Sequence, residues 1–232
     1  MGMAPRERFE LPRITPAVFE TAAIPGLATS AQDSPTSHAI KRLFARTRYY
    51  YWHRRLGVGT LSDVVSDIKR AKAASIELSV LSTEVKDRAL GAMAQALDSS
   101  REQILEANAR DLEAAKAMLD SGEISGSMYK RLKIDGSKID GMIAGINDVI
   151  GLADPVGEQM SALDLDDGLT LYQIRCPIGM LGMIFESRPD VVPQIMSLCL
   201  KSGNAVAFKG GREAANSIRV LFTILRDAAS TA

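Results

Sequence analysis

The spacing of the apolar residues changes once along this chain, and the change limits the folds that it can adopt. Between residues 61 and 150 apolar side chains recur at intervals of three and four, which is typical of amphipathic helices. Residues 169 to 232 instead alternate apolar runs of strand length with helical stripes. That order is typical of a parallel sheet whose strands are joined by crossover helices. We therefore expect an α/β chain in which helices precede the start of a parallel sheet.

Four amphipathic helices are expected in the first of these regions. The first begins at Leu61, and the second follows Ser82, a residue type that often caps helices. The third stops near Gly122, and the fourth ends at Gly151. Their apolar stripes are the expected helical core. The stripes comprise Leu61, Val64, Val65, Ile68, Ala71; Val85, Ala89, Met93, Leu97; Leu105, Leu112, Ala115, Leu119; Ile139, Met142, Ile143, Ile146, Val149 and Ile150.

Three segments of strand character follow the helical region. The first, LTLYQIRC, starts at Leu169 and alternates apolar with polar residues. The second, IGMLGMIF, follows Pro177, and its continuous apolarity predicts a strand that is covered on both faces. The third is a short buried strand at residues 205 to 208. Helices are expected over residues 191 to 201 and 212 to 229.

Polar residues gather where the second and third strand segments end. Because the carboxyl ends of parallel strands meet at one edge of a sheet, both groups are expected to line one crevice. An arginine there can bind a phosphate or carboxylate, and a lysine beside two glycines can reach a ribose phosphate. A pair of solvated loops accounts for the same spacing equally well, and neither a GxGxxG nor a GxxxxGK[ST] motif is present. The residues are Glu186, Ser187, Arg188, Lys209, Gly210 and Gly211.

Residues 1 to 60 differ in character from the rest of the chain. They carry a net charge of +5, whereas residues 61 to 232 carry −5. Five prolines interrupt the first forty residues, so we expect a basic, largely disordered extension. Basic and aromatic residues alternate between Lys41 and Leu56, which suits a nucleic-acid strand or an anionic membrane. A targeting presequence and an extension without function are the alternatives, and no recognised nucleic-acid module supports the first interpretation.

The composition excludes several classes of protein. Two cysteines and two histidines, spread along the chain, are too few for a zinc site or a disulfide scaffold, so no metal is expected. No apolar run is long enough for a transmembrane segment, and the N-terminus lacks the apolar region of a secretory signal. We therefore expect a cytoplasmic protein.

Residues 175 to 217 carry a family resemblance. They read RCPIGMLGMIFESRPDVVPQIMSLCLKSGNAVAFKGGREAANS. The ESRP after a PIGxxGxI strand, the LCLKSGNAV segment and the basic residue before Gly-Gly occur in the order found in gamma-glutamyl phosphate reductase. This family, also called glutamate-5-semialdehyde dehydrogenase, lies in the aldehyde dehydrogenase superfamily. The upstream segments RAKAAS, LSTEVKDRALGAMAQAL, ILEANARDLEAAKA and DPVGE are similar to its N-terminal helices, so the resemblance covers about residues 61 to 232.

The resemblance implies an activity and a cofactor. The family reduces L-glutamyl 5-phosphate to L-glutamate 5-semialdehyde with NADPH, in proline biosynthesis. Residues 61 to 232 would then form part of the NADP-binding domain, with helices at 61 to 150 and a Rossmann-like α/β part at 169 to 232. Arg188 would contact the oxyanion or the phosphate, and Lys209 would lie near the 2′-phosphate of NADPH. The implied cofactor-binding residues are Glu186, Ser187, Arg188, Lys209, Gly210 and Gly211.

One feature of the family is missing from this sequence. Its nucleophilic cysteine lies downstream of the Gly-Gly turn in a separate catalytic domain, whereas this chain ends at Ala232. Neither Cys176 nor Cys199 is expected to replace it, because a reactive thiol needs an accessible, electropositive setting. We therefore expect a fragment that is inactive alone and needs the missing catalytic half or a homo-oligomer. The alternatives are a catalytically dead binding or assembly module and, last, an N-terminal segment that is itself the functional part.

Overall fold

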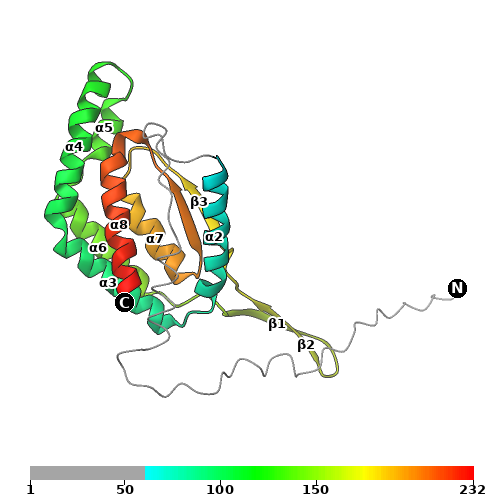
Figure 1. Cartoon of the computed structure of the whole chain (residues 1–232). Coiled ribbons are helices and arrows are strands. Elements are labelled where there is room, and N and C mark those ends of the chain that lie inside the picture. Colours follow the sequence, from blue (N-terminus) through cyan, green and yellow to red (C-terminus); the bar gives the residue numbers. More distant parts are fainter. Residues whose placement is uncertain (1–60) are drawn as a thin grey trace. The chain divides into compact units, whose positions relative to one another are not determined.

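The computed structural model describes residues 61 to 232, with the side chains of 61 to 64, 66 and 67 left out. The predictions for residues 1 to 60, including the basic aromatic segment, therefore lie outside the described residues. Helices precede a small sheet, as expected (Figure 1). The elements in chain order are α2 (Leu61–Ser79), α3 (Thr83–Ser99), α4 (Arg101–Asp120), α5 (Gly126–Leu132), α6 (Gly136–Gly151), β1 (Gln159–Asp166), β2 (Leu169–Ile174), β3 (Met180–Ile184), α7 (Val191–Lys201), β4 (Ala205–Lys209), the 3-10 turn η2 (Arg212–Ala214) and α8 (Ala215–Thr231).

The main core lies between helices α3, α4, α6, α7 and α8. Helix α3 packs against α6, α7 and α8, and α4 packs against α8. The predicted stripes of α3 and α6 supply buried side chains to this core, among them Leu97 and Ile139, while α8 adds Leu221 and Leu225. Removing these side chains from water is the main stabilising contribution, at about 25 cal/mol for each Å² of apolar surface.

Two helical details differ from the sequence-based expectation. The stripe of the first helix is wrong in part, because Val65 and Ile68 are exposed. Helix α2 contacts β3 and β4 instead through a face that includes Ala71, Ala74 and Leu78. Its small side chains allow close packing on the strands. Helix α5 was not expected, because its seven residues are too few to show a helical period.

Strands β3 and β4 form a two-stranded parallel sheet, which confirms the predicted parallel pairing. Helix α7 connects them, and in Figure 1 the two strands lie between α7 and α2. The expectation that β3 is covered on both faces is wrong, because Ile178, just before it, and Ile184, its last residue, are 73% and 76% exposed. Within the described residues β3 pairs only with β4, so its other edge has no neighbouring strand.

The strand segment that starts at Leu169 lies outside the parallel sheet. It forms β2, which pairs with β1 in a separate antiparallel ribbon that projects from the helices (Figure 1). Strand β1 was not expected. Every residue of β1 is exposed, and in β2 only Thr170 is less than exposed. Residues 163 to 166 of β1 alternate apolar and acidic side chains, and Asp167-Gly168 forms the two-residue loop before β2, so the sequence carries a hairpin signal that the expectation missed.

Two buried lysines tie α3 and α7 to neighbouring segments. Lys86 is fully buried and its Nζ lies 2.8 Å from Oδ2 of Asp154, just before the ribbon. Lys201 donates to Oδ1 of Asp87 at 2.6 Å and to the carbonyl oxygen of Ile150 at 3.0 Å. Because a buried charge is stable only when it is paired, these contacts fix α3, α7 and the start of the ribbon relative to one another. No helix among the described residues is long and apolar enough to cross a membrane.

Candidate functional site

The pairing of β3 with β4 brings the two predicted groups of polar residues to the same end of the sheet. Ile184 is the register partner of Lys209, and the amide of Phe185 donates to the carbonyl oxygen of Lys209 at 3.1 Å. The turn of residues 186 to 190, here the ESRP turn, therefore starts beside the turn of residues 209 to 211, here the KGG turn. The sequence-based expectation that the two turns lie at one edge agrees with this geometry.

Three charged residues of these turns are exposed, and the small residues are buried. Glu186, Arg188 and Lys209 are exposed, whereas Gly210 and Gly211 are buried. The Arg188 side chain is 50% exposed and its guanidinium lies 3.3 Å from Oδ2 of Asp190. Among the described residues, Lys209 forms no ion pair. Both cationic side chains are therefore exposed at the carboxyl end of the β3–β4 sheet.

Ser187, a predicted cofactor contact, is buried in the ESRP turn. It is 1% exposed, and its backbone φ of 52° lies in the left-handed region. Its amide and its hydroxyl both donate to Oε1 of Glu213, at 2.7 Å and 2.8 Å. The structure therefore directs the polar groups of Ser187 inward to Glu213, a residue of η2 that the sequence-based reasoning did not select.

The carboxylate of Glu213 also lies against Gly211. A Cβ atom placed on Gly211 would overlap the carboxylate of Glu213. The sequence-based interpretation assigned this glycine to close approach of a cofactor, whereas here the space above it is taken by a side chain of the same chain. No periodicity or motif connects Glu213 with Ser187, so only the fold could reveal the contact.

A third basic residue stands near these turns. Arg212 follows the KGG turn, its side chain is 68% exposed, and it lies 2.7 Å from Oε2 of Glu123 in the α4–α5 connection. Because an exposed ion pair of this kind is weak, Arg212 can exchange Glu123 for another anion at little cost. Among the described residues no group of three His, Cys, Asp or Glu side chains could hold a metal ion.

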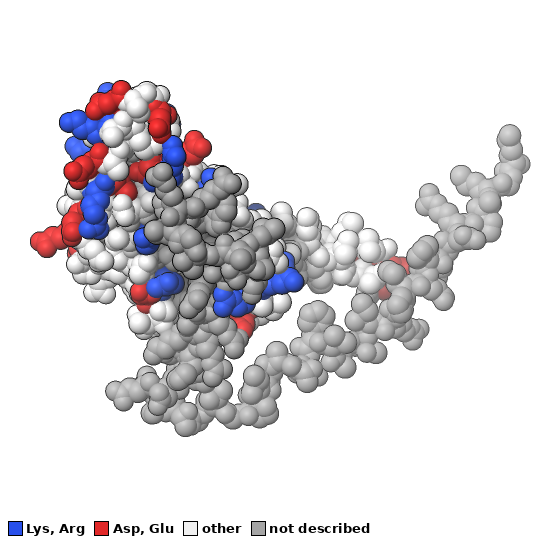
Figure 2. Space-filling view, turned by 45° about the horizontal axis from the view of Figure 1, so that its top comes forward, with Lys and Arg blue, Asp and Glu red and all other residues white. Residues whose placement is uncertain are grey.

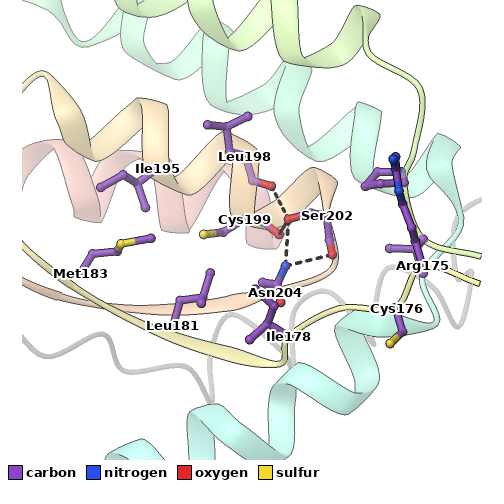
Figure 3. Close-up of a pocket in the computed structure, with 12 residues that line it drawn as sticks. Arg175, Cys176, Ile178, Leu181, Met183, Ile195, Leu198, Cys199, Ser202 and Asn204 are labelled. Atoms are coloured by element: carbon purple, nitrogen blue, oxygen red, sulfur yellow. Dashed lines mark hydrogen bonds between the residues drawn. The ribbon is translucent and has the colours of Figure 1, made fainter.

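An apolar pocket of about 410 Å³ lies beside β3 and α7, and none of the six predicted site residues lines it. Figure 3 shows Leu181 and Met183 of β3 facing Ile195 of α7 across this pocket. Both cysteines also line it. Burial raises the pKa of the Cys199 thiol to about 11, so this thiol is protonated at neutral pH. Cys176 is exposed and precedes β3, at the opposite end of that strand from Arg188.

Comparisons with known proteins agree on one family. No protein-family model matches the chain. The gamma-glutamyl phosphate reductase of Methanosarcina barkeri is 63% identical over 163 residues, which cover 70% of this chain and 36% of that protein. A crystal structure of gamma-glutamyl phosphate reductase from Thermotoga maritima superposes with a TM-score of 0.66 at 36% identity, over 71% of this chain and 39% of the other.

The yeast enzyme gives a similar result. The crystal structure of gamma-glutamyl phosphate reductase from Saccharomyces cerevisiae has a TM-score of 0.66 at 40% identity and covers 74% of this chain and 42% of its own. These matches confirm the α/β fold with its N-terminal helices. The chain spans well under half the length of each of these relatives. Over about 70% of its length the chain is therefore homologous to gamma-glutamyl phosphate reductases, and it spans 36% of the length of the Methanosarcina barkeri protein.

Proposed function

We propose that this chain supplies the NADPH-binding turns of a glutamate-5-semialdehyde dehydrogenase. The enzyme would reduce L-glutamyl 5-phosphate to L-glutamate 5-semialdehyde in proline biosynthesis. One observation carries the proposal: the parallel pairing of β3 with β4 sets the ESRP turn beside the KGG turn at the carboxyl end of the sheet. Ligands of open α/β sheets bind at this end. Relatives named gamma-glutamyl phosphate reductase support the choice of reaction.

The residues at these turns fit a phosphorylated dinucleotide in charge and size. The exposed ammonium of Lys209 is suited to the 2′-phosphate. Gly210 follows it and adds no side chain beside that ammonium. Arg188 would hold the acyl phosphate or polarise the carbonyl oxygen that gains negative charge. Glu186 lies in the same turn. When bound, the nicotinamide would supply the hydride for the reduction.

The proposed NADPH contact predicts different effects on two cofactors. Replacing Lys209 with alanine should weaken NADPH binding about tenfold, because a charged hydrogen bond to the 2′-phosphate is lost. NADH lacks this phosphate, so its dissociation constant should change little. Titration followed by nicotinamide fluorescence measures both constants. Lys116→Ala removes an exposed lysine of α4 and is the matched control.

The two cofactors also define the outcomes that would contradict the proposal. Equal losses of NADPH and NADH affinity in Lys209→Ala would show that Lys209 does not contact the 2′-phosphate. If the folded wild-type chain binds neither cofactor, the proposal that these turns bind NADPH is wrong. Cofactor binding without any partner-dependent reduction would favour the second candidate, a binding or assembly module that keeps the crevice without the chemistry.

We further propose that the chain alone does not turn over its substrate. The reaction needs a thiolate to displace the phosphate, and Cys199 is held as a buried thiol while Cys176 precedes β3. The expected result is no NADPH oxidation when the purified chain is mixed with glutamyl phosphate, followed by absorbance. Turnover that disappears in Cys199→Ser, with Ser197→Ala as a control on the same helix, would refute this proposal.

We also propose that the chain binds a partner chain, and that this partner is a second copy of the same chain. The β1–β2 ribbon exposes seven large apolar side chains, and Figure 2 shows it as largely uncharged surface with acidic residues toward one end. A lone two-stranded ribbon is marginally stable in water, so a covering partner would stabilise it. The exposed side chains are Met160, Leu163, Leu165, Leu169, Leu171, Tyr172 and Ile174.

Self-association through the ribbon has a direct test. Leu163 and Leu171 are register partners, and replacing both with serine should shift a dimer to a monomer in light scattering coupled to gel filtration. Leu105→Ser, at an exposed leucine of α4, should leave the mass unchanged. A wild-type chain that stays monomeric would overturn self-association and favour a separate chain that carries a catalytic domain. Both cysteines are free thiols, which suits the cytoplasm as the proposed compartment.

A further inference from the structure

The carboxylate of Glu213 sits between the two turns of the candidate site. Glu213 lies in η2, after the KGG turn, and only 9% of the residue is exposed. One of its oxygens, Oε1, accepts the amide hydrogen and the hydroxyl hydrogen of Ser187. Glu213 forms no ion pair among the described residues. Its buried charge is therefore balanced at least in part by hydrogen bonds from the ESRP turn rather than by a cation.

Ser187 has a backbone conformation that needs such support. It is the one residue other than glycine with positive φ among the described residues, at 52°. A side chain makes this conformation unfavourable, so it persists where surrounding contacts hold it. The two hydrogen bonds to Glu213 are contacts of this kind. Arg188 follows directly, so the direction in which its side chain leaves the turn depends on the conformation of Ser187.

The KGG turn is coupled to the same carboxylate. Because a Cβ on Gly211 would overlap the Glu213 carboxylate, the glycine leaves the space that the carboxylate needs to reach Ser187. We infer that Glu213 is a positioning residue, which fixes Ser187 in its left-handed conformation and thereby sets the direction of Arg188 relative to Lys209. The inference depends on the proposed function only in the experiment that measures NADPH binding.

The inference is tested first by a readout that needs no ligand. In the wild-type chain the Ser187 amide should resonate far downfield and exchange slowly with solvent, because it donates to a carboxylate. Glu213→Ala should abolish both properties. Gly211→Ala should do the same by displacing the carboxylate, even though Glu213 is still present. Glu213→Gln keeps an acceptor oxygen and should retain part of the protection, which gives a second variant if Glu213→Ala folds poorly.

The second readout is a double-mutant cycle on NADPH affinity. Glu213→Ala should weaken NADPH binding about tenfold, the loss expected when one charged contact is misplaced. In a Ser187→Gly background the same substitution should change affinity by less than about twofold, because glycine adopts positive φ without support. Asp227→Asn, at an exposed carboxylate of α8, is the control for loss of charge.

The outcomes separate this inference from the proposed function. Equal losses from Glu213→Ala in the wild-type chain and in the Ser187→Gly background would overturn it, because Glu213 would then act on the ligand or on the fold directly. An unchanged Ser187 amide in Glu213→Ala would also overturn it. If the wild-type chain does not bind NADPH, the proposed function fails, while the amide measurements on the Glu213 and Gly211 variants still decide whether Glu213 positions the turn.

Discussion

Replacing Asp154 with alanine is expected to lower the free energy of unfolding by about 3 to 5 kcal/mol, because the substitution leaves Lys86 as an uncompensated buried charge. The Lys86 side chain is fully buried, and its Nζ lies 2.8 Å from Oδ2 of Asp154. The same carboxylate accepts the hydroxyl of Thr83 at 3.0 Å and the amide of Val156 at 2.9 Å. Equilibrium unfolding in urea, followed by circular dichroism, measures the change.

Two further variants test the cause of this loss. Adding Lys86→Met to Asp154→Ala should recover much of the stability, since no buried charge is then left unpaired. Arg110→Ala breaks an exposed ion pair with Glu106 and should cost less than about 1 kcal/mol. A similar cost for Arg110→Ala and Asp154→Ala would show that the burial of Lys86 has no special effect.

The same ion pair gives a pH dependence with a defined sign. Burial by itself raises the pKa of Asp154, but hydrogen bonds from Lys86, Val156 and Thr83 outweigh it and hold the pKa below its ordinary value of 3.8. The stabilisation is therefore complete above the unfolded-state pKa and is lost as the pH falls through the lower folded-state pKa. The difference in unfolding free energy between the wild type and Asp154→Ala should accordingly shrink below about pH 4.

Replacing Asp111 with alanine is expected to cost about 3 to 4 kcal/mol of unfolding free energy, because four donors lose one buried acceptor group. Asp111 of α4 is 2% exposed. Its Oδ1 accepts hydrogen bonds from the backbone amide and the side-chain amide of Asn216. Its Oδ2 accepts hydrogen bonds from the backbone amide and the hydroxyl of Ser217. These amides belong to the first turn of α8, whose own N-cap residue, Ala214, has no capping side chain.

Matched variants on the same helices distinguish this capping role from a general effect. Glu113→Ala removes an exposed carboxylate of α4 and should change the free energy of unfolding by less than about 0.5 kcal/mol. Ser217→Ala removes one of the four donors and should cost about 1 kcal/mol. Amide exchange at Asn216 should accelerate in Asp111→Ala more than at Leu225, deeper in α8. Unchanged exchange at Asn216 would contradict the assignment of Asp111 as the cap.

The sequence predicts the parts of this fold that depend on local periodicity. Helices α3, α6 and α8 each bury a continuous apolar stripe, so their residues repeat at the helical interval and the helices are recognisable. The position of the ESRP and KGG turns at one end of the sheet was predictable too, because parallel strands leave no other arrangement. The β1 strand was missed although residues 163 to 166 alternate apolar and acidic side chains and Asp167-Gly168, a pair typical of two-residue hairpin turns, follows them.

The interior of the candidate site depends on contacts that sequence spacing does not encode. Ser187 and Glu213 are 26 residues apart, and their contact exists because β4 returns the chain beside β3. The amide and hydroxyl of Ser187 both donate to Glu213, a contact that the sequence does not reveal, and the role of Ser187 as a cofactor contact stays a prediction. Gly211 was interpreted as a space for a ligand, and the structure fills that space with a carboxylate. Arg188 and Lys209 as NADPH contacts stay predictions.

The β1–β2 ribbon projects from the helices, so a small rotation at its base moves its tip by a large distance. Strand β1 has eight residues, so at about 3.3 Å for each residue its tip stands roughly 26 Å from its base. A tilt of about 10° at the base would swing the tip by roughly 5 Å, the distance between neighbouring strands. The short segment in which the amide of Val156 donates to Asp154 lies at the base of the ribbon, so it would set where the exposed apolar side chains meet a second copy under the proposed self-association.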